Sequence, residues 1–165
     1  MTERAPTRTN RPASRRPALA GLALAIAAAL IAPRTARADV TADCEFLEIS
    51  AKGGDKPAID ADLKPLEKKL KKPPLSTWTH FKLLSRSQKV LAKKKAEAIP
   101  LKIGSATATL VETVDKSKVR LTVTIDDQKG KQVVSNTTLV EAGDYVIMVH
   151  ELPNNEGHLL SVTCK

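Results

Sequence analysis

Apolar and polar positions alternate without a break along residues 118–126. A period of two is typical of a half-buried β-strand, because successive side chains of an extended chain point to opposite faces. Most of the apolar positions are β-branched, as strands favour. The segment therefore predicts a strand with one buried face, which carries Val119, Leu121, Val123 and Ile125.

The same kind of pattern fills the chain after residue 104. Short segments rich in Asp, Asn, Gly and Pro separate the runs. Connections this short favour hairpins. We therefore expect strands at 105–114, 118–126, 131–140, 144–152 and 158–164. Residues 145–149 are apolar on both faces, so we expect that strand to lie in the middle of a sheet.

The first half of the chain predicts fewer strands and one short helix. Residues 44–51, 79–85 and 87–94 have the composition of strands, and Pro100 favours an edge position for the extended piece around it. The whole pattern predicts a mainly β fold. It would be a single antiparallel β-sandwich, or a partly closed barrel, with one short helix near the N-terminus.

The predicted helix covers residues 63–72. Leu63, Leu66 and Leu70 recur at helical spacing, Asp62 is a suitable N-cap, and two prolines follow at 73 and 74. Pro65 is tolerated in the first turn of a helix. The stripe of leucines predicts one buried face.

Five lysines of this segment fall away from the leucine stripe. They form either a solvated face or a patch for an anionic partner, such as phospholipid, lipopolysaccharide or a cell-wall polymer. The lysines are Lys64, Lys68, Lys69, Lys71 and Lys72.

Residues 1–38 have the features of an export signal. Basic residues precede a 15-residue apolar run at 18–32, and Ala36-Arg37-Ala38 matches a signal-peptidase site. The run is shorter than the roughly 20 residues that span a bilayer. Arg15 and Arg16 also fit the twin-arginine route in part, so both export routes stay open. We expect cleavage after residue 38, with an uncleaved anchor as the alternative, and a single β-rich domain at 39–165 in the periplasm or outside the cell.

Most of the positive charge lies in this predicted leader. The full chain has 27 basic and 18 acidic residues, a net charge of +9. The leader holds seven arginines and one glutamate, which leaves 20 basic and 17 acidic residues, or +3, for the predicted domain. Because nucleic-acid binding calls for a strongly basic domain, we expect no nucleic-acid partner. Membrane contact is expected only through the leader or peripherally.

The chain has two cysteines, Cys44 and Cys164. An even number in an oxidising compartment favours a disulfide. Such a bridge would close almost the whole predicted domain and would require the first and last strands to be neighbours. The alternative is two separate buried thiols.

The sequence shows no motif for catalysis or for a cofactor. A metal site would need closely spaced ligands, and the three histidines, His80, His150 and His158, form no such set. His150 and His158 flank the last predicted turn and could face each other as a weak metal or pH-sensitive pair, but we expect two surface histidines. We predict no cofactor, no metal and no catalytic residue.

Several segments resemble a group of small exported bacterial β-rich proteins with no known activity. The resemblance lies in residues 63–66 through 73–74, 79–84, 136–139 and 157–160. It implies an exported β domain and assigns no site residues.

These observations predict a non-enzymatic binding module of the bacterial cell envelope. Its partner would be an envelope protein or an anionic envelope polymer. The alternative is an accessory protein or small hydrolase whose site is assembled from loops around His80 or His150. A third possibility is a structural subunit of a surface machine, which an exposed apolar edge strand would suggest.

Overall fold

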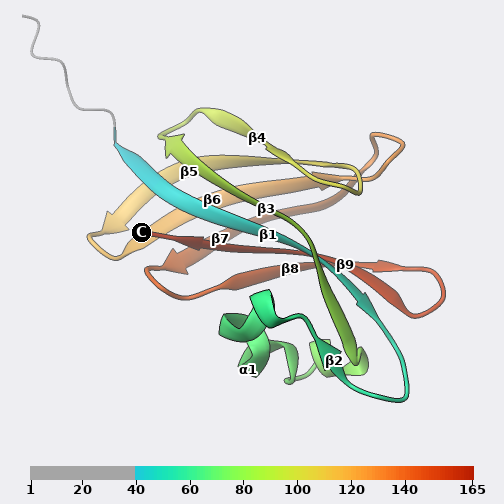
Figure 1. The fold of residues 1–165 in the computed structure, drawn as a ribbon. Helices are drawn as coiled ribbons and strands as arrows, with labels where there is room; N and C mark the ends of the chain where they lie inside the picture. The colour runs from blue at the N-terminus through green and yellow to red at the C-terminus, as the bar shows by residue number, and fades with distance from the viewer. Residues whose placement is uncertain (1–39) are drawn as a thin grey trace, which may run out of the picture. The chain divides into compact units, whose positions relative to one another are not determined.

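The computed structural model describes residues 40–165, and the predicted leader lies outside these residues. The described chain is mainly β, with nine strands and a short helical segment (Figure 1). The strands are β1 Thr41–Lys52, β2 Ala58–Ile59, β3 His80–Ala92, β4 Ala96–Pro100, β5 Ser105–Asp115, β6 Lys118–Asp126, β7 Gln132–Glu141, β8 Val146–Leu152 and β9 Glu156–Cys164.

The strands form two sheets in a sandwich-like arrangement. The larger sheet has the order β2-β3-β1-β9-β8 and the smaller one the order β4-β5-β6-β7. All pairs are antiparallel except β2 with β3, so the larger sheet is mixed and the prediction of a purely antiparallel fold is wrong at this edge. Neither sheet of the described chain closes into a barrel.

The central strand of the larger sheet is β1, which pairs with β3 on one side and β9 on the other. The first and last strands are therefore neighbours, as the predicted disulfide requires. The predicted strands 79–85 and 87–94 are one continuous strand, β3, because no turn-forming residue separates them. Pro100 ends the edge strand β4, as predicted.

The prediction that residues 145–149 lie in the middle of a sheet is wrong, because β8 is an edge strand. Its two apolar faces have another cause. Val146 and Met148 pack into the core between the sheets, whereas Ile147 and Val149 pack under the helical segment. The two faces of β8 are buried because other layers of the fold cover them from above and below. They do not indicate a paired strand on each side.

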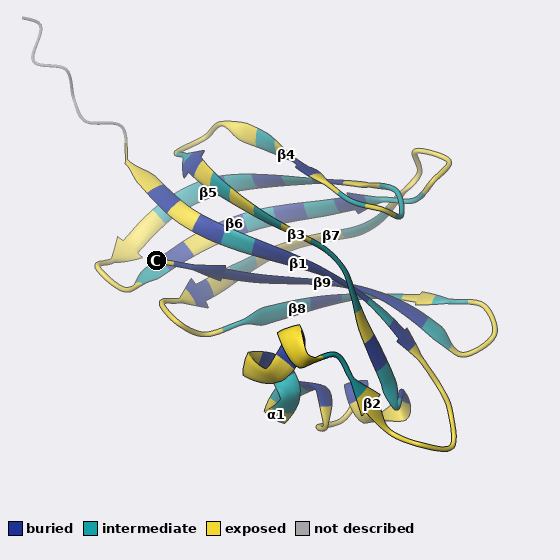
Figure 2. Ribbon diagram, in the orientation of Figure 1, coloured by how far each residue is buried: buried dark blue, intermediate teal, exposed yellow. Residues whose placement is uncertain are grey.

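Strand β1 carries many buried residues (Figure 2), and they belong to two separate cores on its two faces. Ala42, Cys44 and Phe46 face the smaller sheet and join the core between the sheets. Leu47 and Ile49 point to the opposite face, where the helical segment covers them. A strand covered on both faces needs this second apolar layer, which the leucine stripe supplies.

The helical segment begins two residues earlier than predicted, and only its last four residues are α-helical. A 3₁₀ helix, η1, spans Ala61–Leu66, the α-helix α1 spans only Glu67–Leu70, and a second 3₁₀ turn, η2, spans Leu75–Thr77. The cap is Asp60 and not Asp62, since the Asp60 side chain accepts from the Asp62 backbone N–H at 3.4 Å. None of the helices in the described chain is long and apolar enough to cross a membrane.

The predicted leucine stripe is confirmed. Leu63, Leu66 and Leu70 are fully buried. They pack in one core with Trp78, whose Nε1 donates to the Asn155 carbonyl at 3.1 Å. Burial of each leucine side chain contributes about 2 kcal/mol to folding. The stripe therefore fixes the helical segment on the larger sheet.

Candidate functional site: the free edge of the smaller sheet

Strand β7 forms one edge of the smaller sheet and pairs only with β6. Its ten residues, QVVSNTTLVE, include no charged residue between Gln132 and Glu141 and no proline or glycine. A strand edge presents unpaired backbone N–H and C=O groups that can pair with another strand. Natural proteins usually protect such an edge with charge, proline or a very short strand.

The middle of β7 is exposed on both faces. Ser135, Asn136 and Thr137 are all exposed, although successive side chains point to opposite sides of the sheet. Asn136 pairs with the buried Val123 of β6, so it lies on the side of the core, yet it remains open to solvent. The larger sheet therefore does not cover this part of β7.

The outward side of β7 is rich in hydroxyl groups. Thr137 lies opposite Thr122 of β6, and their hydroxyl oxygens are 2.8 Å apart. Ser135 lies opposite Thr124 in the same way. Leu139 follows on the same side and is 40% exposed. No residue of β7 itself is charged on this side, and Arg120 of β6, opposite Leu139, is paired with Glu112 at 2.9 Å.

The other three edges are shorter or carry charge. β2 has two residues, and β4 has five, ends at Pro100 and carries the ion pair Lys95–Glu97 at 2.7 Å. β8 has seven residues and includes Glu151. The Tyr145 carbonyl, just before β8, accepts a hydrogen bond from Lys69 Nζ at 2.5 Å. Strand β3 is also open on one side beyond Phe81, because β2 pairs only with His80 and Phe81, but this stretch carries Lys82, Arg86 and Lys89. Among the described strands, β7 therefore has the longest open edge without charge in its middle.

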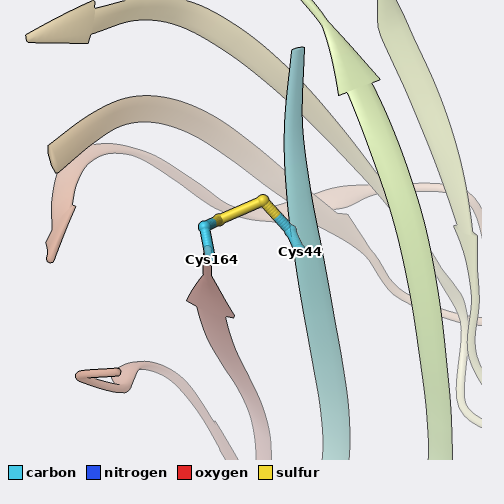
Figure 3. Close-up of a disulfide and its surroundings, with 2 residues drawn as sticks. All are labelled: Cys44 and Cys164. Atoms are coloured by element: carbon cyan, nitrogen blue, oxygen red, sulfur yellow. A yellow bond between two sulfur atoms is a disulfide. The ribbon is translucent and has the colours of Figure 1, made fainter. Parts of the chain in front are cut away.

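The predicted disulfide joins Cys44 of β1 to Cys164 of β9 (Figure 3). The two residues are directly paired in the sheet, with Cα atoms 4.1 Å apart. The bridge spans 120 residues of sequence and both cysteines are buried. A disulfide of this kind is consistent with an oxidising compartment.

The predicted lysine patch is only partly free. Lys69 forms an ion pair with Asp144 at 2.7 Å, and Lys71 pairs with Glu67 one turn earlier. Lys64, Lys68 and Lys72 are exposed. Because α1 is a single turn, the five lysines do not lie along one continuous helical face.

The three histidines have three different surroundings. His80 lines a surface hollow next to β2, with its Nδ1 3.1 Å from the Thr79 hydroxyl. His150 and His158 lie directly opposite each other in β8 and β9, the arrangement that the sequence analysis had left as the alternative. The prediction that both are surface residues is wrong for His158, which is 2% exposed. No group of three or more potential metal ligands occurs among residues 40–165.

His158 is buried because it contacts Glu48, a buried carboxylate that the sequence analysis did not identify. Glu48 accepts four hydrogen bonds: from His158 Nε2 at 3.0 Å, the Ser85 hydroxyl at 2.6 Å, and the backbone N–H groups of Lys102 and Ile103 at 2.7 and 2.8 Å. Burial raises the pKa of Glu48, but these hydrogen bonds outweigh it and lower the pKa from 4.5 to about 2.

This cluster has the wrong order for nucleophilic catalysis. A catalytic triad places the base between the nucleophile and the acid, whereas here the Glu48 carboxylate lies between the Ser85 hydroxyl and the His158 ring. An ionised carboxylate only accepts hydrogen bonds, so His158 Nε2 is a donor and does not act as a base here. The cluster instead holds the connection between β4 and β5 against the larger sheet.

Two features were thus missed from the sequence. Glu48 shares its face of β1 with the apolar residues Cys44 and Phe46, and an acidic residue in line with them is the one signal that was available. The free edge could not be recognised because hairpin patterns do not show which strand ends a sheet.

Comparisons with known proteins gave no relative for this chain. No protein-family model, curated protein or solved structure matched it. The resemblance to small exported bacterial proteins therefore has no support from these comparisons.

Proposed function

We propose that this protein is an exported, non-enzymatic interaction module of the bacterial cell envelope that binds an extended segment of a partner protein along β7. One observation carries the proposal: β7 is a ten-residue edge with neither charge nor proline in its middle. Nine register pairs join β7 to β6 and nine join β6 to β5, so the strand is held in place from one side along its length. Strand addition to such an edge forms backbone hydrogen bonds in a fixed geometry.

The partner segment would be uncharged in its centre. The side chains that it would meet are hydroxyl, amide and apolar groups, from Val133 to Val140. Charge occurs only at the two ends of the strand, where Lys131 precedes it and Glu141 pairs with Lys118 at 2.7 Å. A partner strand in which small polar and apolar residues alternate would match the side chains on both faces of β7.

The predicted leader and the disulfide support the envelope location. The Cys44–Cys164 bridge ties the two ends of the domain together, which suits a protein that works outside the reducing cytoplasm.

Lysine substitutions test the proposal. The double variant Ser135→Lys, Thr137→Lys adds charge to the free edge, and Ala96→Lys, Ala98→Lys adds the same charge to β4 at the opposite edge. The tagged mature forms are crosslinked in cells, and the captured proteins are identified by mass spectrometry. We expect one envelope protein to be captured by the wild type and by the β4 variant, and lost in the β7 variant.

Two results would overturn this proposal. Equal capture by both variants would exclude β7 as the contact. A homodimer in sedimentation equilibrium that the β7 substitutions dissociate would assign the edge to a second copy of this chain. Urea unfolding followed by the fluorescence of Trp78 shows that each variant is folded.

A further inference from the structure

Two rows of hydroxyl side chains cross the outward face of the smaller sheet. One row consists of Thr109, Thr122 and Thr137, and the other consists of Thr107, Thr124 and Ser135. Directly opposed members of a row have Cβ atoms about 5 Å apart. Ala108 and Val123, which lie between row members in the sequence, are fully buried, so the rows face away from the core. The rows therefore run across β5, β6 and β7 to the free edge.

The two rows end differently at the two edges of the sheet. At the β4 edge they meet Ala96 and Ala98, whose side chains form no hydrogen bonds. At the β7 edge they end in Ser135 and Thr137, which are both exposed. No member of either row is charged, although 27% of the residues of the chain are charged. A strand added to β7 could thus extend both rows, whereas a strand added to β4 could not.

The hydroxyl groups at the β7 edge can form further hydrogen bonds. The hydroxyl oxygens of Thr137 and Thr122 are 2.8 Å apart and share one hydrogen bond. A hydroxyl can donate once and accept twice, so Thr137 can bond to a second neighbour. The Ser135 hydroxyl forms no hydrogen bond with any residue of the described chain. Both groups can therefore pair with a hydroxyl on the next strand, as Thr137 pairs with Thr122.

Leu139 continues the outward side of β7 beyond Thr137. Its side chain is 40% exposed, which makes it one of the few large apolar side chains on the surface of the described chain. The pairing of β7 with β6 has no bulge over residues 134–141. Ser135, Thr137 and Leu139 therefore project to the same side of the sheet at regular spacing.

On the basis of the proposed function, we infer that the segment that binds β7 has the pattern apolar-x-hydroxyl-x-hydroxyl. Each hydroxyl residue is Thr or Ser, and x stands for the small residues on the other face. The direction is antiparallel, because all pairs of the smaller sheet are antiparallel and this pairing is slightly more stable per residue. The apolar residue then covers Leu139, and the two hydroxyl residues lie opposite Thr137 and Ser135. Cross-strand pairs of Thr with Thr or Ser stabilise a sheet, so these two positions select the partner.

Two synthetic peptides, blocked at both ends, test this inference on the ¹⁵N-labelled mature protein. The first peptide is Lys-Leu-Ala-Thr-Ala-Thr-Ala-Lys. The second has valine in place of both threonines, which keeps the shape of these side chains but removes the hydroxyl groups. Amide chemical shifts along β7 measure the two affinities. We expect the threonine peptide to bind about fivefold more tightly, because it forms two cross-strand hydroxyl pairs.

Two double variants of the protein locate the origin of this preference. Ser135→Ala, Thr137→Val removes the hydroxyl groups at the edge and should abolish the preference for the threonine peptide. The control Thr107→Val, Thr109→Val removes two hydroxyl groups from the same rows in β5, where no partner strand reaches. The fivefold preference should remain in this control.

A failure of the hydroxyl preference can be distinguished from a failure of strand addition. If both peptides shift the β7 amides with equal affinity, or if the preference persists in the Ser135, Thr137 variant, the edge binds strands without selecting hydroxyl groups, and the inferred pattern is refuted. If neither peptide causes saturable shifts along β7, the edge does not accept a strand, and the proposed function is refuted with it.

Discussion

Replacing Glu48 by glutamine tests the buried carboxylate cluster. The substitution keeps the size of the side chain but removes the charge, and one of the two oxygens becomes an NH₂ group that cannot accept. Lys102 N–H and the Ser85 hydroxyl bind Oε2, whereas Ile103 N–H and His158 bind Oε1. Two of the four donors would therefore lose their acceptor.

The expected loss of stability follows from the pKa. Lowering the pKa of Glu48 from 4.5 to about 2 corresponds to about 3 kcal/mol of folding free energy at neutral pH. Its side chain is 0% exposed, so solvent does not screen the contacts. We expect Glu48→Gln to lower the free energy of unfolding by about 3 kcal/mol at pH 7.

The same linkage predicts the effect of pH. Because the pKa is lower in the folded state, the stabilisation is fully present above the unfolded pKa of about 4.5 and is lost as the pH falls towards 2. The wild type should lose about 3 kcal/mol over this interval through Glu48, and the variant should lack that part of the decrease.

Urea unfolding followed by Trp78 fluorescence measures both effects, since Trp78 is the only tryptophan and is 6% exposed. The control is Glu141→Gln, which removes an exposed carboxylate paired with Lys118 and should cost less than about 1 kcal/mol. A loss below about 1 kcal/mol for Glu48→Gln, with an acid dependence equal to that of the wild type, would refute the reasoning.

Three further substitutions test the scaffold, each by urea unfolding. Replacing Cys44 and Cys164 by alanine removes a bridge over 120 residues and should lower the free energy of unfolding by about 4–5 kcal/mol. An unchanged free energy of unfolding would mean that the disulfide does not restrict the unfolded chain. Leu70→Ala leaves a cavity under α1 and should cost about 2–5 kcal/mol, whereas a cost below about 1 kcal/mol would show that the segment is not packed on the sheet. Gly157→Ala places a Cβ atom 2.8 Å from the Trp78 ring and should cost about 1–3 kcal/mol with a shifted emission maximum; wild-type stability and emission would contradict this contact.

Local patterns in the sequence predicted the strands well because their physical basis is local. Alternation in residues 118–126 matches β6 in both bounds, and the five strands after residue 104 all occur. The Cys44–Cys164 pair could be predicted because only two cysteines are present. Each of these inferences needs no knowledge of which elements lie on which face.

The predictions that were wrong or missing concern features that depend on tertiary contacts. The edge position of β8 was hidden because its two apolar faces are covered by different layers. The burial of His158 depends on Glu48, which is 110 residues away in the sequence. The hollow at His80 and the free edge of β7 likewise arise only when distant strands come together.

Site-specific photocrosslinking along β7 tests the proposed function most directly. A photoreactive amino acid replaces Thr137 on the free edge of β7 or, as the control, Ala98 on the edge strand β4; both positions are exposed. Crosslinking is carried out in cells that export the protein. We predict that position 137 crosslinks to one envelope protein and that position 98 does not. Crosslinks to that protein from position 98 alone, or from neither position while the partner still copurifies, would contradict strand addition along β7.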